Sequence, residues 1–252
     1  MNKLTETTRA YKLTDIDGYT RSDPVNSTYW QDGSWHETSG EGTLHGTGWI
    51  QAYTHPLVAV LFNTIHSNFD TFRLWELEVA GKIKKHHGLK IGVTRARAVR
   101  QLPVPVITTE QCITFAILCA AHVTSDDDWN QWAWAWLLGI DRSPESARTA
   151  ICRMEIYAED ARSLARMLLE ERINASVMRT ARAKLSAAKA AIHASLAAQY
   201  ARMQHVFYET AYKTAVAWAA TWAKDASVNM AKTQRINVVA IAEAACRTKQ
   251  TT

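Results

Sequence analysis

Hydrophobic residues recur with two different periods in the stretch that carries the densest fold information. Residues Trp49–Tyr53 are aromatic and β-branched, which favours a strand. Leu57, Leu61 and Ile65 then recur every four residues, as on a helix with one buried face. Residues Leu74–Val79 alternate with period two, which is typical of a strand. The pattern therefore predicts strand, helix, strand in this order.

The same criteria predict elements on either side of this unit. Thr54 or His55 can cap the helix, which has Pro56 in its first turn, where the missing N–H of proline loses no hydrogen bond. Strands and one basic turn are expected as follows: strands at Tyr11–Thr14, Leu89–Val93 and Arg97–Leu102, and the turn over Gly81–Gly88.

After these strands the pattern becomes helical. Thr108 and Gln111 have the spacing of a capping box ahead of an apolar run. Ser125 is expected to cap the next helix, whose first turn holds three aspartates that suit the helix dipole. Three tryptophans of that helix lie on one stripe and predict a packing surface: Trp129, Trp132 and Trp136.

Glycine and proline disappear from the last part of the chain. All ten glycines and all five prolines lie at or before Pro144, and residues 145–252 contain 28 alanines. Alanine has the highest helix propensity. We therefore predict an α+β protein, with a mixed sheet and helices over residues 1–141 and an all-helical, alanine-rich domain or hairpin over 142–252. A break is expected at Asp225–Asn229 and a last short helix at Ile236–Ala245.

The composition argues against several classes of protein. The chain has no run of about 18 or more apolar residues, so no membrane-spanning segment is expected. The first residues lack the apolar centre of a secretory signal. The four cysteines show neither CxxC nor cysteine–histidine metal spacing, which favours buried thiols, a reducing compartment and a cytoplasmic protein. No metal and no other cofactor are expected.

Charge is unevenly distributed, with a net charge of −3 over residues 1–141 and +8 over 142–252. No acidic residue occurs between Glu171 and Glu209. Such a region can neutralise phosphates, face an acidic protein or be solvated. No aromatic residue interleaves it, and no nucleic-acid-binding motif accompanies it. The candidate partner-binding residues fall within about 100° of arc on one helix and form the basic stripe: Arg172, Arg179, Arg182 and Lys189.

Two carboxylates, Glu76 and Glu78, lie on one face of the strand expected at Leu74–Val79. They are the best candidates for chemistry, although a half-buried strand with a polar outer face also explains them. The sequence contains no P-loop, GxGxxG, GxSxG or HExxH motif. No reaction can be assigned from these residues alone.

Five segments resemble an uncharacterised domain family of tailed phages and prophages: YKLTDIDGYTR, GWIQAYTHPLVAVLFNTIHSNF, RLWELEV, GLKIG and TTEQCITFAILCA. The resemblance covers about residues 10–145, and members of the family often continue into an alanine-rich helical tail. It implies a phage accessory protein of the host cytoplasm without a known activity. We therefore expect a protein that binds a host or phage macromolecule, for counter-defence or host takeover, with homo-oligomerisation through the helical half as a further option.

A second likeness implies an enzyme. The order aromatic strand, Thr-x-Pro helix and strand with paired carboxylates is similar to half of an ADP-ribosyltransferase fold, and the segment from Leu44 to Thr47 is similar to the histidine motif of its His-Tyr-Glu class. The short spacer and the mid-domain carboxylates depart from that class. The resemblance implies NAD as cofactor and these residues: Glu76 or Glu78 as the catalytic carboxylate, and His45, Tyr53 and His55 as cofactor-binding groups.

Overall fold

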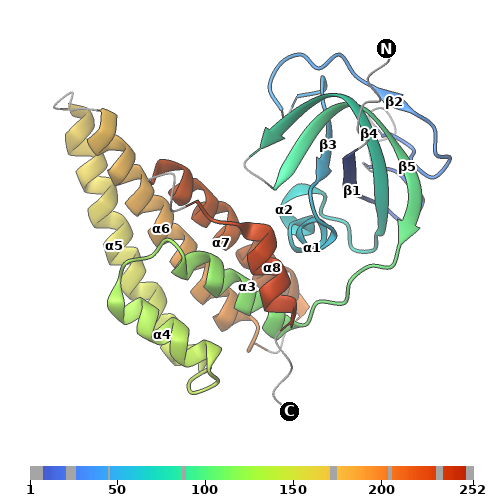
Figure 1. Ribbon diagram of the computed structural model, residues 1–252. Coiled ribbons are helices and arrows are strands. Elements are labelled where there is room, and N and C mark those ends of the chain that lie inside the picture. Colours follow the sequence, from blue (N-terminus) through green and yellow to red (C-terminus); the bar gives the residue numbers. More distant parts are fainter. Residues whose placement is uncertain are drawn as a thin grey trace. The chain divides into compact units, whose positions relative to one another are not determined.

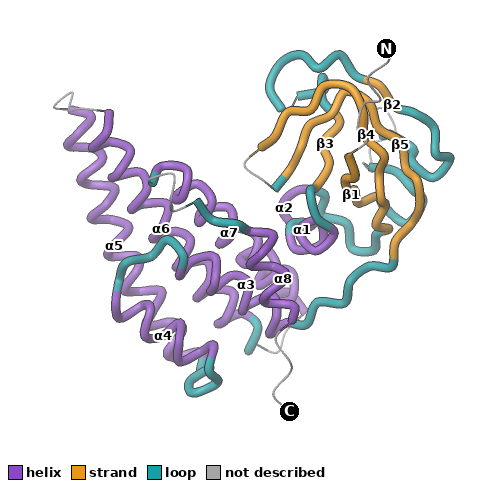
Figure 2. The backbone as a smooth tube through the Cα atoms, viewed as in Figure 1, coloured by secondary structure: helices purple, strands orange, loops and turns teal. Residues whose placement is uncertain are grey.

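The computed structural model describes residues 8–20, 27–44, 46–86, 89–170, 175–203, 206–230 and 235–247. The chain divides into two compact units, Met1–Val106 and Ile107–Thr252. The first holds an antiparallel sheet and the second is helical (Figures 1 and 2). The α+β class predicted from the sequence is therefore confirmed. The boundary between the units lies earlier than the predicted one at residue 141, because the helices that follow residue 107 pack with the later helices.

The sheet of the N-terminal unit closes on itself through antiparallel pairings. Neighbouring strands pair in the cycle β1–β4–β5–β3–β1, and β2 is added alongside β5. The predicted strand–helix–strand order is confirmed as β3, α1 and β4, and His55 is the residue that caps α1. The bounds of the elements are β1 Thr8–Thr14, β2 His36–Glu37, β3 Ile50–Tyr53, α1 Pro56–Leu61, α2 Asn63–His66, β4 Arg73–His86 and β5 Lys90–Leu102.

The turn predicted over Gly81–Gly88 is wrong for most of its length, because β4 continues to His86. The strand register shifts between Ala80 and Ile83, as in a β-bulge. Gly81 absorbs this shift with φ of 78°, and a Cβ at this position would collide with the hydroxyl of Thr94. The two strands predicted after the turn are one strand, β5.

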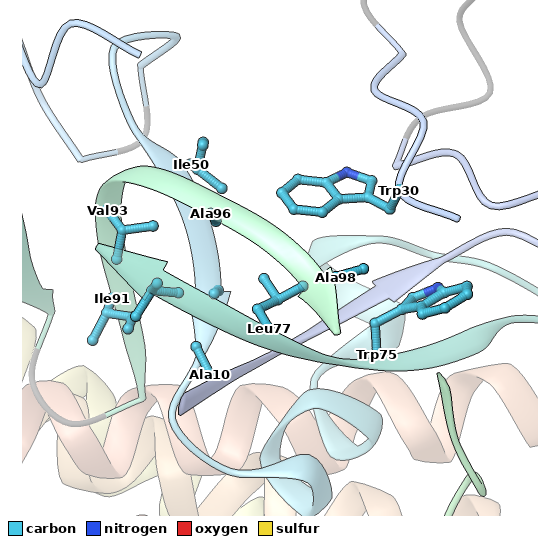
Figure 3. Packing of buried hydrophobic residues seen from close by; sticks show 11 residues of the cluster. Ala10, Trp30, Ile50, Trp75, Leu77, Ile91, Val93, Ala96 and Ala98 are labelled. Atoms are coloured by element: carbon cyan, nitrogen blue, oxygen red, sulfur yellow. The ribbon is translucent and has the colours of Figure 1, made fainter. Parts of the chain in front are cut away.

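The inward face of the sheet is apolar, as the alternation in β4 predicted (Figure 3). Trp75 is buried, and its indole N–H donates to the hydroxyl of Thr14 at 2.9 Å. The helix α1 packs against β1 and β3, and its buried residues include Val58 and Ala59. The buried cluster consists of Ala10, Trp30, Ile50, Ala52, Trp75, Leu77, Val79, Ile91, Val93, Ala96 and Ala98.

In the helical unit, α6 packs against both α5 and α7, while α3 contacts α6, α7 and α8. The capping box of Thr108 and Gln111 is confirmed. Asp126, not Ser125, caps α4, because its carboxylate accepts the N–H of Trp129 at 2.8 Å. The helices are α3 Thr109–Ala121, α4 Asp127–Leu137, α5 Pro144–Glu170, α6 Ala175–Tyr200, α7 Val206–Asn229 and α8 Val238–Arg247. None of those described is long and apolar enough to cross a membrane.

The break predicted at Asp225–Asn229 is wrong, since α7 continues through these residues. The predicted packing role of the tryptophan stripe in α4 is confirmed, with Trp134 off the stripe and 56% exposed. Alanines make up most of the buried residues of α6 and many of those of α7, and an alanine has little apolar area to bury. Fully buried alanines are Ala188, Ala190, Ala191, Ala194 and Ala197 on α6, and Ala217, Ala219, Ala220, Ala223 and Ala226 on α7.

Replacing Ala191 with leucine is expected to lower the free energy of unfolding of the helical unit by at least about 1 kcal/mol, because the extra atoms have no room in a close-packed interface. Ala244, exposed on α8, is the matched control, and Ala244→Leu should change stability by less than about 0.5 kcal/mol. Denaturant titration followed by circular dichroism at 222 nm measures both. Equal effects would show that the interface has room for larger side chains.

Candidate functional site

The closed sheet of the N-terminal unit is paired most sparsely between β1 and β3, which meet at a single position, Tyr11 opposite Tyr53. A cavity of about 390 Å³ is lined by residues from both strands, from the segment between β1 and β3, and from α2 and β5. We call it the sheet cavity. Its volume lies within the range of about 300–1,000 Å³ that is usual for small-molecule sites.

Two lysines from different strands line the sheet cavity. Lys12 of β1 donates from Nζ to the backbone carbonyl of Gln51 at 2.8 Å, and its Nζ lies 5.1 Å from the ring centroid of Trp30. Lys90 of β5 lies opposite Tyr53 in the strand register, with Nζ 5.2 Å from the ring centroid. The two ammonium groups therefore contact the same residue, Gln51: Lys12 at the backbone carbonyl and Lys90 at the side chain.

Lys90 is buried, with 8% of its surface exposed. Its Nζ lies 3.5 Å from Oε1 of Gln51, which is a weak contact, and no carboxylate among the described residues forms an ion pair with it. Burial lowers the pKa of Lys90 to about 8. At pH 7 the cavity thus holds a positive charge that the described part of the chain does not neutralise.

The wall of the sheet cavity also carries polar nitrogens without a partner. Nε1 of Trp30, Nε1 of Trp49 and Nε2 of His36 are buried and form no hydrogen bond with any described residue. An indole nitrogen can only donate, so the two tryptophans present donors. Glu37, the carboxylate on this wall, is engaged by Arg95 at 3.0 Å. The cavity lining therefore includes buried donors that lack a partner among the described residues.

Tyr53 and His66 meet at the same wall, where the tyrosine hydroxyl lies 3.0 Å from Nδ1 of the histidine. Burial raises the pKa of Tyr53 above its ordinary value of 10.0, so the phenol stays protonated at neutral pH. Tyr53 is therefore a neutral hydrogen-bonding group of the wall. It is the one described member of the predicted NAD-binding set that lines the sheet cavity.

The other members of that set lie elsewhere. His55 accepts the N–H of Leu57 at 3.3 Å as the cap of α1, and its ring centroid lies 6.4 Å from that of Tyr11. His45 lies outside the described residues. Of the cofactor-binding residues that the ADP-ribosyltransferase resemblance implies, Tyr53 alone among those described lies at the sheet cavity.

The two predicted catalytic carboxylates are held by arginines. Glu76 is 5% exposed and pairs with Arg9 at 3.1 Å and with Arg100 at 2.7 Å. Glu78 pairs with Arg97 at 2.6 Å. Glu76 does lie in one cross-strand row with Tyr11 and Tyr53, but neither carboxylate lines the sheet cavity. These ion pairs give both carboxylates a structural role, and their catalytic role stays a prediction.

The basic stripe lies on α6 for the residues that the structure describes. Arg179 and Arg182 are exposed, and Arg172 lies outside the described residues. Lys189 differs, because its Nζ lies 4.0 Å from the ring centroid of Trp222 on α7. No aromatic residue interleaves the stripe in the sequence, but at this end an indole ring from α7 lies beside it. The sequence did not indicate the contact because the two residues come from different helices.

Comparison with protein-family models, with curated proteins and with solved structures gave no match. The site residues therefore have to be argued from their own chemistry. Sequence reasoning missed the two lysines of the sheet cavity. One feature could have indicated Lys90, namely a lysine between Leu89 and Ile91 in an otherwise apolar strand. In the described ranges, no group of three metal-ligating side chains is arranged to hold a metal.

Proposed function

We propose that the N-terminal unit binds an anionic small molecule in the sheet cavity. The observation that carries the proposal is the buried ammonium group of Lys90, which has no carboxylate partner among the described residues. Burying a charge is costly unless it is paired. A carboxylate or phosphate group of a ligand would supply that pairing through a charge-assisted hydrogen bond.

The donors next to Lys90 indicate that the ligand carries several acceptor atoms in addition to one negative charge. The indole N–H groups of Trp30 and Trp49 and the ammonium of Lys12 line the same cavity as Lys90. A ligand with several acceptor oxygens would pair with Lys90 and with the two indole N–H groups together, whereas a cation or an apolar molecule would leave these three groups without a partner. The substrate class that fits is therefore a small organic or inorganic oxyanion.

The charges around the sheet cavity favour binding of an anion over an enzymatic reaction on NAD. A carboxylate that stabilises the positive charge developing as nicotinamide leaves must face that charge. Glu76 and Glu78 are held by arginines away from the wall, where the groups next to Tyr53 are cationic. Cations in this place would oppose a developing positive charge and would hold an anion.

Replacing Lys90 with methionine is expected to weaken anion binding at least about tenfold, because one charge-assisted hydrogen bond is lost. Isothermal titration with pyrophosphate and with citrate at pH 7 measures the effect. The control is Lys85→Met, which removes the same charge from an exposed position on β4. Wild-type affinity should also fall as the pH rises above about 8, where the ammonium of Lys90 loses its proton.

Three outcomes would contradict this function. If wild-type protein binds neither probe, or if Lys90→Met and Lys85→Met bind equally well, the cavity does not bind such anions through Lys90. Binding that is unchanged between pH 7 and pH 9.5 would assign the contact to a different group.

We further propose the broader role that the sequence resemblance implies, an accessory protein of a phage that binds a host or phage macromolecule in counter-defence or host takeover. It is supported by the resemblance of residues 10–145 and by the net charge of +8 over residues 142–252. A pull-down from infected cells tests it. Recovery of one partner in stoichiometric amount supports the role, and turnover of NAD without a partner would overturn it.

A further inference from the structure

One surface of the helical unit combines a pair of stacked indole rings, one of them exposed, with cations. The rings of Trp218 and Trp222 on α7 stack, with centroids 6.1 Å apart and an interplanar angle of 26°. Trp218 is 38% exposed, which is unusual for a tryptophan in a helix bundle. From α6, Lys189 lies over Trp222, and the ring of His193 lies 6.5 Å from that of Trp218. We call these residues, together with Arg182, the aromatic–basic surface.

The charge of this surface comes from Lys189 and Arg182. The two residues are seven positions apart on α6, or about two turns, so they share a face and lie roughly 10 Å apart along the helix. Neither forms an ion pair with any described residue. The sequence of α6 contains no aspartate or glutamate, although Asp225 follows Trp222 by one turn on α7. Burial, and then the charge of Lys189, lower the pKa of His193, so this imidazole is neutral at pH 7.

We infer that the aromatic–basic surface binds single-stranded nucleic acid. The exposed ring of Trp218, backed by Trp222, offers a platform on which a base stacks, and the adjacent cations neutralise the neighbouring phosphates. Duplex nucleic acid hides the faces of its bases, and an acidic polypeptide without aromatic residues, such as polyglutamate, has no flat rings to stack on the tryptophans. Single strands present both chemistries at once. This inference uses a different unit from the sheet cavity and stands independently of the proposed anion binding.

The size of the surface sets its expected affinity. A length of roughly 10 Å accommodates only two or three nucleotides, so binding should be weak and dependent on salt. Two phosphate contacts predict a slope of about −1.4 for the logarithm of the association constant against the logarithm of salt concentration, at about 0.7 per contact on a single strand.

Fluorescence anisotropy of a labelled 20-residue oligothymidylate, with full-length protein at low salt, tests the inference. The double variant Arg182→Gln, Lys189→Gln should bind at least about tenfold more weakly. The matched control Arg166→Gln, Lys184→Gln removes two charges from exposed positions of the same unit and should bind within about twofold of wild type. Trp218→Ala should weaken binding at least about fivefold, and Trp218→Phe should retain part of it.

Three results would overturn the inference. One is equal binding of an abasic oligonucleotide of the same length, because stacking would then contribute nothing. A second is an equal loss of affinity in both double variants, which would indicate that binding depends on net charge and not on a defined site. The third is tighter binding of an acidic polypeptide such as polyglutamate than of the oligonucleotide, which would assign the surface to a protein partner. Circular dichroism establishes that each variant is folded.

Discussion

Replacing Trp129 with alanine is expected to lower the free energy of unfolding of the helical unit by about 3–5 kcal/mol. Trp129 is fully buried on α4, and its ring centroid lies 5.7 Å from that of Trp132. Its indole N–H donates to the hydroxyl of Ser195 on α6 at 3.0 Å. The substitution therefore removes both a large buried side chain and a buried hydrogen bond between two helices.

The hydroxyl of Ser195 keeps one partner in this variant, because it also donates to the carbonyl of Ala191 at 3.0 Å. The loss should therefore arise mainly from the cavity left by the indole. Denaturant titration followed by circular dichroism at 222 nm measures it. Trp134→Ala is the control, since Trp134 lies on the same helix but is 56% exposed and should change stability by less than about 1 kcal/mol. Similar losses in both variants would contradict the packing assigned to Trp129.

Replacing Lys90 with methionine is expected to stabilise the N-terminal unit at pH 7 by about 3 kcal/mol. The pKa of Lys90 is about 8 in the folded protein, against an ordinary value of 10.5. Below pH 8 the folded and unfolded states are both protonated, and the folded state carries the full cost of a buried charge. Each unit of pKa difference corresponds to about 1.4 kcal/mol, and methionine removes the charge with little change of shape.

The same pKa difference sets the sign of the pH dependence. Between pH 8 and 10.5 the unfolded state binds more protons than the folded state, so the free energy of unfolding of the wild type should rise with pH in this window. The rise should be absent from Lys90→Met and present in Lys85→Met. Hydrogen exchange of peptides that cover β3 and β5, in the full-length protein at increasing denaturant, measures all three. A Lys90→Met variant that is less stable than wild type at pH 7 would show that the ammonium is well paired.

Local patterns predicted the elements whose information lies within one stretch of sequence. The alternation through Trp75 and Leu77, the capping box at Thr108 and the tryptophan stripe of α4 were each correct because periodicity and capping depend on neighbours in the chain. The turn over Gly81–Gly88 was wrong for a related reason. Glycine and lysines usually indicate a turn, yet here Thr94 of the partner strand fixes the backbone of Lys82 and carries β4 onward.

The site depends on contacts that no local pattern contains. Lys12, Trp30 and Lys90 are far apart in the sequence and meet only because β1, β3 and β5 are neighbours in the closed sheet. The stacked indoles on α7 likewise meet Lys189 only when α6 and α7 pack together. The domain boundary predicted at residue 141 differs from the boundary between the compact units, which lies after Val106. The loss of glycine and proline marks where the helices become alanine-rich, and it does not mark where the units separate.

The fully buried alanines of α6 and α7 limit which substitutions this protein can accept. Alanine is already the smallest side chain that favours a helix, so a fully buried alanine such as Ala220 has almost no acceptable replacement. Every larger residue overpacks the interface, and glycine weakens the helix by about 1 kcal/mol. In a saturation mutagenesis screen these positions should tolerate serine at most, while exposed positions of the same helices accept most residues. Relatives of this chain should therefore keep the spacing of α6 and α7 even where their surfaces share no detectable similarity.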